Sequence, residues 1–270
     1  MKISFIGCGN MGECILSGLV QSGKYPSHAI CVFNRTKASV ERLCTQYGVS
    51  GAASAVAAAA SGDVIIIGVK PKGVCEVLES ICDAVTEEKI VVSIAAAINI
   101  ESMEKALKYT PRKVVRVMPN VPTRVQSGVT SITPNLQVSA SEVEKICQMF
   151  HTIGLVVEVT EQQIHSVIGV AGSSPAYVFL FLEAMADAAV LGGLPRALAY
   201  ELAAQAVLGS ARLLQESGMT PGQLKDMVCS PGGTTIEAVR SLERSGMRSS
   251  VIEAMVSCMK KSKELEEALN

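Results

Sequence analysis

The first 160 residues alternate between short apolar runs and longer stretches of helical character. Largely apolar runs occupy residues 2–6, 29–33, 64–69, 90–94 and 114–118. Runs of this length and composition are typical of strands that are buried on both faces of a parallel sheet. Because helical stretches separate the runs, the pattern predicts a doubly wound α/β sheet.

The pattern changes past Glu158, where strand-like runs stop and long segments rich in Ala, Leu and Met begin. Helices are expected over residues 174–191, 195–214 and 235–270, the last with a break at residues 245–246. These helices are apolar around most of their circumference, so each needs more than one partner surface. We predict an α/β domain over residues 1–160 and a helical domain over residues 161–270 that packs against another subunit.

The first predicted strand runs directly into a G-x-G-x-x-G turn made by Gly7, Gly9 and Gly12, and helix-forming residues follow. In this setting Gly7 permits a tight turn, Gly9 lets the backbone approach a pyrophosphate, and Gly12 lets the helix pack closely on its strand. The N–H groups and the positive dipole end of the helix then hold phosphates. Glycine-rich turns also arise for steric reasons alone, but the strand before and the helix after favour a dinucleotide site.

The end of the second predicted strand bears on which dinucleotide binds. Sites selective for NAD carry an Asp or Glu here, whereas an Arg favours the 2′-phosphate of NADP. This chain has Asn34, Arg35, Thr36 and Lys37, with no acid, and Arg35 suits a forked phosphate contact. The alternative is that Thr36 and Lys37 simply begin a helix in solvent. We predict NADPH as the cofactor, with NADH as the alternative.

Further candidate residues follow the later strands. Ligands of open α/β sheets lie beyond the carboxyl ends of the strands. Lys70 and Pro71 end the third predicted strand, and the small residues 95–97 end the fourth, where they permit close approach of a flat ring. Asn120 lies between two prolines in a stiff loop after the fifth strand, and this loop is expected to display its amide side chain.

A second glycine-rich segment lies in the predicted helical domain, from Ser230 through Gly232 and Gly233. Thr234 and Glu237 have the spacing of a capping box at the start of a helix. Such a helix start can hold a substrate carboxylate through backbone N–H groups without an arginine. The alternative is a well-capped helix that binds nothing.

Composition narrows the class of protein. The 270-residue chain has a formal net charge of −1, which gives no overall basic field for nucleic acid or an anionic membrane. Its nine cysteines are scattered without C-x-x-C spacing and indicate buried free thiols in a reducing compartment. The apolar run at the N-terminus is short enough to be a strand, and residues 176–191 carry two acids and are short for a bilayer span. We therefore expect a soluble, cytoplasmic protein.

Other polar residues have simpler interpretations. Glu183 and Asp187 lie one helical turn apart and are predicted to form a polar seam with Arg196 or Arg212 instead of a catalytic pair. The three histidines, His28, His151 and His165, have no metal-ligand spacing, so no metal site is predicted. His28 is expected in a surface loop and His151 at a helix end, and His165 is kept as a minor active-site candidate near the domain junction.

Taken together, these segments resemble the bacterial type of Δ1-pyrroline-5-carboxylate reductases over essentially the whole chain. The motifs that carry the resemblance lie at residues 5–12, 69–71, 93–96, 117–120, 172–177, 223–226 and 230–235. The last is the most specific, because other Rossmann dehydrogenases share the first glycine turn but lack this segment. Two positions depart from the family pattern: Val121 stands where Thr is common, and Ala97 where Gly is common.

The resemblance implies an N-terminal Rossmann domain that binds NAD(P)H and an all-helical C-terminal dimerisation domain, with dimers often assembled into decamers. It implies an active site between one subunit's Rossmann face and helices of both subunits. The expected cofactor-binding residues are Ile6, Gly7, Gly9, Asn10, Met11, Asn34, Arg35, Gly68, Val69, Lys70, Pro71, Ala95, Ala96 and Asn120. The expected substrate-binding residues are Glu161, Ser230, Gly233, Thr234 and Thr235.

The predicted reaction is hydride transfer from NADPH to the imine carbon of 1-pyrroline-5-carboxylate, which gives L-proline. Thr235 is expected to hydrogen-bond the imine nitrogen, while backbone groups at Gly233 and Thr234 hold the carboxylate. A β-hydroxyacid dehydrogenase is a rival hypothesis, but that family uses a lysine in its glycine-rich interdomain helix, and residues 172–191 contain none. An NADPH-sensing protein without turnover is the rival outside enzymes.

Overall fold

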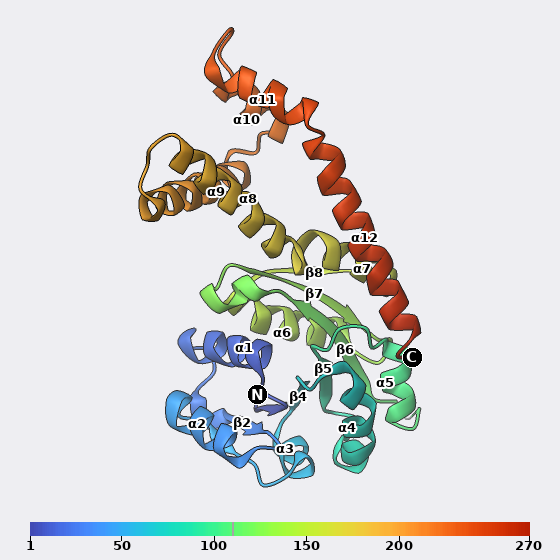
Figure 1. The fold of residues 1–270 in the computed structure, drawn as a ribbon. Helices are drawn as coiled ribbons and strands as arrows, with labels where there is room; N and C mark the ends of the chain where they lie inside the picture. Colours follow the sequence, from blue (N-terminus) through green and yellow to red (C-terminus); the bar gives the residue numbers. More distant parts are fainter. Residues whose placement is uncertain (110) are drawn as a thin grey trace. The chain divides into compact units, whose positions relative to one another are not determined.

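The computed structural model describes residues 1–109 and 111–270, which form two compact units (Figure 1). Unit 1 comprises residues 1–173 and 258–270, and unit 2 comprises residues 174–257. The predicted domain boundary between residues 160 and 161 stays a prediction, because it marks the start of the helical domain in the sequence and not the limit of a compact unit. Residues 161–172 and 258–267 are helical, but the segments 161–173 and 258–270 belong to unit 1 together with the sheet.

One eight-stranded sheet organises unit 1, in the order β3-β2-β1-β4-β5-β6-β7-β8. The strands are β1 (Ile3–Ile6), β2 (Ile30–Phe33), β3 (Ser50–Gly51), β4 (Val64–Ile67), β5 (Ile90–Ser93), β6 (Lys113–Pro119), β7 (Gly128–Pro134) and β8 (Gly154–Glu158). Neighbouring strands from β3 to β6 are parallel, β7 runs antiparallel to β6, and β8 runs parallel to β7. The first six strands have the Rossmann order. The five predicted strands are confirmed as β1, β2, β4, β5 and β6.

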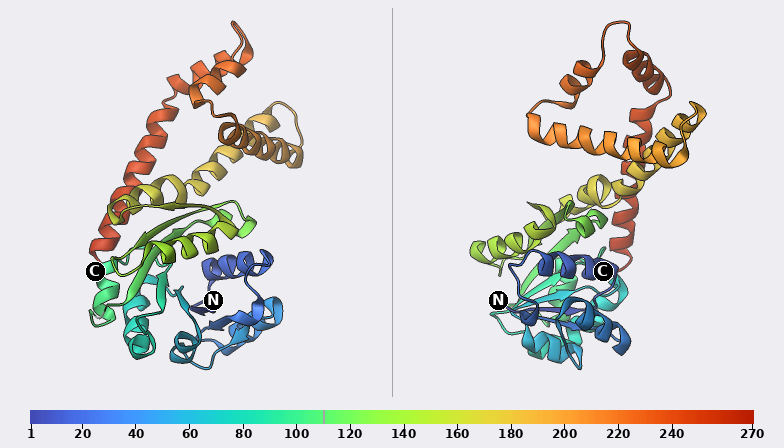
Figure 2. Two further views of the ribbon diagram at one scale, coloured as in Figure 1. Left: turned by 180° about the vertical axis from the view of Figure 1, so that it is seen from behind. Right: turned by 90° about the vertical axis from the view of Figure 1, so that its left-hand side faces the viewer.

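Helices cover both faces of this sheet (Figure 2). The α-helices of unit 1 are α1 (Asn10–Gln21), α2 (Lys37–Tyr47), α3 (Ala55–Ser61), α4 (Val74–Ile81), α5 (Ile100–Ala106), α6 (Ala140–Phe150) and α7 (Ile164–Val167). Alternate residues of each strand enter opposite cores: Ile66 packs with α1, α2 and α6, whereas Ile65 and Ile67 pack with α3, α4 and α5. This double burial explains the largely apolar strand sequences and confirms the doubly wound sheet.

Short helical segments connect these elements. The 3₁₀ turns are η1 (Ser27–Ala29), η2 (Pro71–Gly73), η3 (Cys82–Ala84), η4 (Val121–Val125), η5 (His151–Ile153) and η6 (Glu161–Gln163), and η7 (Ile168–Gly172) is a π-helical segment. His28 lies exposed in η1, and His151 ends α6, as predicted.

Unit 2 is entirely helical within its described residues, 174–257. Its helices are α8 (Ser174–Leu191), α9 (Arg196–Ser217), α10 (Pro221–Val228), α11 (Thr234–Arg244) and α12 (Met247–Glu267), the last of which continues into unit 1. The predicted break at residues 245–246 is confirmed, with Gly246 at a φ of +74°. Helix α10 was not predicted; it begins with a capping box between Thr220 and Gln223.

The helical run that includes α8 is longer than the apolar stretch seen in the sequence. The helical run Glu161–Leu191, which comprises η6, α7, η7 and α8, is long and apolar enough to cross a membrane, with 11% of its most apolar window buried. Residues 176–191 alone are short for a span, but the helical run that contains them is long enough. Core helices of soluble proteins meet the same criterion, so this is weak support for a membrane segment.

Candidate active site

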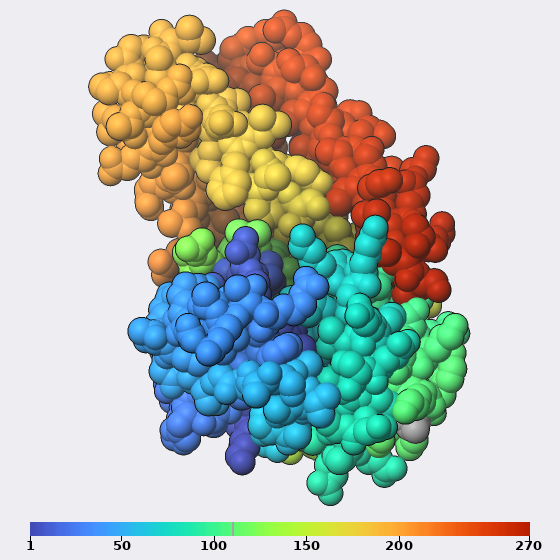
Figure 3. Space-filling model, turned by 60° about the horizontal axis from the view of Figure 1, so that its bottom comes forward, coloured from blue at the N-terminus to red at the C-terminus, as the bar shows by residue number. Residues whose placement is uncertain are grey.

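The carboxyl ends of β1, β2, β4 and β5 meet at one edge of the sheet. Ile6 pairs with Phe33 and with Ile67, and Ile67 pairs with Ser93. The residues that follow these ends therefore leave the sheet side by side. The direction of chain progression reverses between β1 and β4, the point at which open α/β sheets bind their ligands. In Figure 3 the segment that contains β1 and β2 (blue) and the segment that follows β4 (cyan) meet on one face of unit 1.

The first glycine of the turn has no room for a side chain. Gly7 has a φ of +83°, and a Cβ atom there would lie 2.5 Å from Val69 Cγ1 and 2.8 Å from the Val69 nitrogen. A Cβ atom at Gly68 would in turn collide with the Gly7 carbonyl oxygen. The Gly7 N–H donates to the Phe33 carbonyl at 2.8 Å. The turn is thus locked between β2 and β4 in the tight form predicted for it.

Gly9 is different, because a Cβ atom there would meet nothing within 4 Å. Gly9 precedes α1 and gives its first N–H groups no side-chain cap. These groups have no partner within the helix, and their dipole favours an anion. Gly12 is buried, and a Cβ atom there would lie 3.3 Å from the Gly7 carbonyl oxygen. The open space before uncapped amides fits a dinucleotide pyrophosphate.

Asn34 supports this turn from within. Its Oδ1 accepts from the Cys8 N–H at 2.6 Å, and its Nδ2 donates to the Cys8 carbonyl at 3.2 Å and to Ser39 Oγ at 2.9 Å. The side chain therefore joins the glycine turn to α2. Its expected contact with the cofactor stays a prediction. Sequence reasoning gave no sign of this supporting role, although an Asn directly after a strand is suited to bonding backbone groups.

Arg35 has the exposure that a phosphate contact requires. It is exposed beyond the end of β2 and has no hydrogen bond or ion pair within the described part of the chain. Thr36 precedes α2 without a side-chain cap, and Lys37 lies 3.8 Å from Glu41 in an exposed pair. A free guanidinium beside the sheet edge fits the 2′-phosphate of NADP.

The other expected cofactor residues surround the same edge. Lys70 is exposed and leads into η2, whose first residue is Pro71. After β5, Ala95 is buried and Ala96 is exposed. Ala97, the departure from the family pattern, has a φ of +63°, a conformation that favours glycine.

Asn120 points inward instead of displaying its amide. It is 7% exposed, donates through Nδ2 to the Ala171 carbonyl at 2.9 Å, and accepts at Oδ1 from the Val129 N–H at 2.8 Å. The expectation of a displayed amide is wrong because the backbone groups of η7 and β7 use both ends of it. A contact with the cofactor stays a prediction. Val121, which stands where the family commonly has Thr, is the first residue of η4. The residue is 58% exposed, so the change leaves no cavity in the core.

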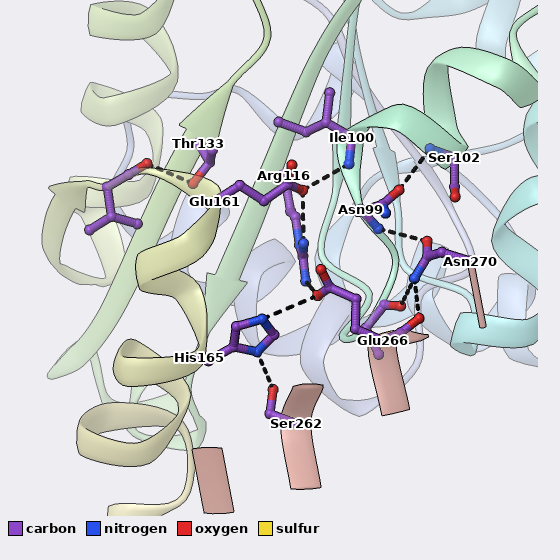
Figure 4. A network of polar contacts seen from close by, with 12 residues as sticks. Asn99, Ile100, Ser102, Arg116, Thr133, Glu161, His165, Ser262, Glu266 and Asn270 are labelled. Carbon is purple, nitrogen blue, oxygen red and sulfur yellow. Dashed lines mark hydrogen bonds and ion pairs between the residues drawn. The ribbon is translucent and has the colours of Figure 1, made fainter. Parts of the chain in front are cut away.

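Glu161 belongs to a network of charges within unit 1 (Figure 4). Its Oε1 accepts from Arg116 Nη1 at 2.8 Å and from the Ile100 N–H at 2.8 Å. Arg116 is 2% exposed and also donates to Glu266 Oε2 at 2.6 Å. His165 Nδ1 lies 2.9 Å from Ser262 Oγ, and its Nε2 lies 3.9 Å from Glu266 Oε2.

Sequence reasoning missed Arg116 and Glu266. The signal was a lone arginine within the apolar run 114–118, since a charge in a buried strand requires a partner. His165 is buried in this network, where its ring contacts Ser262 and Glu266 of α12. The expected place of Glu161 near the substrate stays a prediction.

The second glycine-rich segment lies in unit 2, between α10 and α11. Gly232 has a φ of +67°, and the Gly233 N–H donates to the Ser230 carbonyl at 3.0 Å. Gly233 precedes α11 and makes no side-chain cap. The predicted capping box is wrong, because Thr234 is already inside the helix and Glu237 pairs with Arg240. The first amides of α11 therefore lack a side-chain cap and remain suited to an anion.

Of the two arginines expected to pair with the acids of α8, only Arg196 does so among the described residues. Asp187 pairs with Arg196 at 2.6 Å, as expected, whereas Arg212 pairs with Glu216. Among residues 1–109 and 111–270, no group of three His, Cys, Asp or Glu side chains is placed to hold a metal ion.

All nine cysteines are free, but only Cys8 and Cys82 are fully buried, so the expectation of buried thiols holds for two of them. Burial, followed by the negative charge of Glu13, raises the pKa of the Cys8 thiol to about 12. The thiol in the glycine turn is therefore protonated at neutral pH and would not repel a phosphate.

Comparisons with known proteins cover nearly the whole chain. Residues 161–265 match the model of the family "Pyrroline-5-carboxylate reductase dimerisation", and residues 2–97 match "NADP oxidoreductase coenzyme F420-dependent". The pyrroline-5-carboxylate reductase of Escherichia coli (strain K12) is 50% identical over 267 residues, which cover 99% of each chain.

Solved structures agree with the sequence comparisons. A pyrroline-5-carboxylate reductase from Coxiella burnetii matches with a TM-score of 0.92 and 34% identity, and 98% of each chain is covered. A pyrroline carboxylate reductase from Plasmodium falciparum, solved with NADP bound, matches with a TM-score of 0.88 and 28% identity, again over 98% of each chain. The fold, the glycine turn and these matches agree, and the chain belongs to the pyrroline-5-carboxylate reductase family.

Proposed function

We propose that this protein reduces 1-pyrroline-5-carboxylate to L-proline, the last step of proline biosynthesis, with NADPH as its preferred reductant. The observation that carries the proposal is the presence of two uncapped helix starts on one chain. One follows the open space at Gly9, and the other follows the Ser230–Gly233 turn. The first suits a pyrophosphate and the second suits a small carboxylate.

The cofactor would lie across the sheet edge of unit 1. Gly7 and Gly9 would admit the pyrophosphate, and the first amides of α1 would donate to it. Arg35 would contact the 2′-phosphate that distinguishes NADPH from NADH. The small side chains of Ala95 and Ala96 would flank the ring. When bound, NADPH supplies a hydride, and the residues described here only hold and orient it.

The substrate would be held at the start of α11. The Gly233 N–H is already used by Ser230, so the amides of Thr234 and Thr235 are the available donors to the carboxylate. The Thr235 hydroxyl would hydrogen-bond the imine nitrogen. The hydride would form the new C–H bond at the imine carbon, and the electron pair of the C=N bond would move to nitrogen. A hydroxyl is a weak acid, so the proton on nitrogen comes either with the protonated substrate or through a water held by Thr235.

Assembly would complete the active site. The exposed apolar surfaces of α8 and α9 support a homo-oligomer, and we propose a dimer in which helices of both subunits contribute to each site. A decamer of such dimers and a cytoplasmic location are part of the same proposal. The free cysteines support a reducing compartment.

The first test is loss of NADPH absorbance on addition of pyrroline-5-carboxylate, with parallel reactions that contain NADH, or a 3-hydroxy acid with NADP. Imine-dependent oxidation is expected, faster with NADPH than with NADH. Binding of NADPH without oxidation would instead favour a sensor or another substrate.

The second test is Thr235→Ala. We expect turnover to fall by about 100-fold while the Kd for NADPH stays unchanged, because the hydroxyl acts on the substrate alone. Thr235→Ser keeps a hydroxyl and serves as the matched control, with most of the turnover expected to return. Unchanged turnover in Thr235→Ala would remove this residue from the mechanism.

A further inference from the structure

The loop that follows β5 combines a functional position with an unfavourable backbone. Ala95 and Ala96 belong to the proposed cofactor site. Ala97, directly after them, has a φ of +63° although it carries a Cβ atom. A non-glycine residue keeps such a conformation only where surrounding contacts impose it. The contacts that act on Ala97 therefore decide the shape of the loop beside the cofactor.

One side chain contacts Ala97 and, two residues further along, Asn99. Asn270 donates from Nδ2 to the Ala97 carbonyl at 2.9 Å and accepts at Oδ1 from the Asn99 N–H at 3.0 Å. The Asn270 amide thus spans the backbone from Ala97 to Asn99, and Figure 4 shows its contact with Asn99. Beyond it, Asn99 caps α5 by accepting from the Ser102 N–H at 2.8 Å, and Glu161 accepts from the Ile100 N–H. The loop is held at successive backbone groups.

The segment that carries Asn270 is itself firmly attached. Glu266 pairs with the buried Arg116 at 2.6 Å, one turn before Asn270. Ser262 contacts His165 at 2.9 Å another turn earlier. Leu269 packs against the core cluster that includes α4 and α5. Three contacts from different elements of unit 1 therefore fix the position from which the Asn270 amide acts.

We propose that Asn270 is a positioning residue for the reductase reaction: it holds Ala97 in its left-handed conformation and so keeps Ala95 and Ala96 in the shape that accepts the nicotinamide ring. This inference rests on the proposed cofactor site at the end of β5. Asn270 would touch neither substrate nor cofactor, and its effect would pass through the backbone of residues 97–99.

The test compares Asn270→Ala, Asn270→Asp and Lys261→Ala in the full-length protein. Lys261 lies exposed on α12 and pairs with Glu264, so its removal controls for changes to the helix surface. The readouts are amide hydrogen exchange of residues 97–100 without cofactor, the Kd for NADPH, and separate kcat and KM values.

For Asn270→Ala we expect exchange at Asn99 to accelerate at least tenfold, and the Kd for NADPH to rise about fivefold, the equivalent of one lost hydrogen bond. The KM for the imine should change less than twofold. Asn270→Asp keeps the acceptor for Asn99 but loses the donor to Ala97, so exchange at Asn99 should change little while NADPH still binds more weakly. Lys261→Ala should match the unmodified protein.

A double variant separates positioning from general destabilisation. Glycine adopts a φ of +63° without support, so Ala97→Gly should restore much of the NADPH affinity lost in Asn270→Ala. Unchanged NADPH affinity in Asn270→Ala, or no restoration by Ala97→Gly, would overturn the proposal. Gly9→Ala tests the cofactor site separately. If Gly9→Ala also leaves the Kd for NADPH unchanged, the proposed cofactor site is wrong. Faster exchange at Asn99 in Asn270→Ala would then show only that Asn270 holds the loop.

Discussion

The two units of this protein use similar apolar amino acids but bury them to different extents. In unit 1, every residue of β1 and β4 is buried. In unit 2, helices α8 to α11 bury only Ala186, Ala199 and Ala203, while Phe179 and Leu180 are 61% and 69% exposed. Unit 1 therefore completes its own core, whereas unit 2 presents apolar surface that requires a partner.

In the part of the chain that the structure describes, left-handed non-glycine residues and a buried charge are likewise found in unit 1 and not in unit 2. Among the described residues, the non-glycine positions with positive φ all lie in unit 1: Ala97, Lys108, Tyr109 and Gln126. In unit 2 the described positive φ values belong to glycines. The buried Arg116 lies in unit 1, whereas pairs such as Asp187–Arg196 in unit 2 are exposed. A densely supported unit can hold unfavourable conformations and buried charge, and the helical unit holds neither alone.

The largest effect is expected where unit 2 needs its partner. Phe179→Glu puts a charge on the exposed apolar surface of α8, and burial of an unpaired carboxylate in an interface is strongly unfavourable. We expect the oligomer to dissociate at micromolar concentration and imine reduction to fall by about 100-fold or more. Light scattering measures the mass, and nicotinamide fluorescence should still detect NADPH bound to unit 1.

Val56→Glu is the matched control for this prediction. Val56 lies on α3 of unit 1 with 47% of its surface exposed, and it receives the same substitution. Its assembly and activity should be unchanged. An intact, active oligomer of Phe179→Glu would show that the exposed surface at that position does not form the interface.

Within unit 1, Gly7 should affect stability, whereas Gly9 should affect the binding of NADPH. Gly7→Ala forces a Cβ atom against Val69 at a φ of +83°, and we expect it to lower the free energy of unfolding by about 2–4 kcal/mol. Gly9→Ala adds a methyl group in open space, so its melting temperature should be unchanged while the Kd for NADPH rises at least about tenfold. Calorimetry and fluorescence titration measure the two quantities. Full NADPH affinity in Gly9→Ala would contradict the proposed pyrophosphate position.

The sequence predicted the elements whose cause is local or periodic. Five strands, the glycine turn and the main helices follow from apolar patterning and from glycine, as does the pair between Asp187 and Arg196. Strand β8 was missed because it is half-exposed and lacks a buried apolar run, and β7 because Thr and Ser occupy its buried positions. Periodicity cannot identify strands of this kind.

Interactions between distant residues were harder to predict. Asn120 and Asn34 turn their amides toward backbone groups, and a single sequence does not reveal which groups lie nearby. Residues 258–270 return to unit 1, where Glu266 meets Arg116 across 150 positions of sequence. The capping box at Thr234 failed because the helix begins one residue earlier than its spacing required.

A moderate effect is expected from Glu142, which tests how ion pairs support unit 1. Burial alone would raise the pKa of Glu142, but hydrogen bonds from Lys113 and Ser139 outweigh burial and lower the pKa from 4.5 to about 2. Because the pKa is depressed in the folded state, this stabilisation is present above pH 4.5 and is lost as the pH falls toward 2.

Glu142→Gln should therefore destabilise the protein by about 1–2 kcal/mol at pH 7, and the difference from the unmodified protein should shrink below pH 4.5. Urea unfolding followed by circular dichroism at several pH values measures it. Glu144→Gln, two residues along α6 and exposed, is the control and should have little effect. A difference that persists unchanged at pH 3 would show that the cap, and not the charge, stabilises α6.

The smallest effect is expected from Ala97→Gly in the otherwise unmodified protein. Release of a left-handed alanine is favourable by about 1–2 kcal/mol, but the added flexibility of glycine in the unfolded chain costs about 0.5–1 kcal/mol. The net gain should be about 0.5 kcal/mol, visible as a small rise in melting temperature. NADPH affinity should stay constant, because Asn270 already imposes the loop conformation. A lower melting temperature for Ala97→Gly would mean that the contacts around Ala97 already relieve its backbone strain. The left-handed conformation at Ala97 would then be explained by this loop alone and not by the dense packing of unit 1.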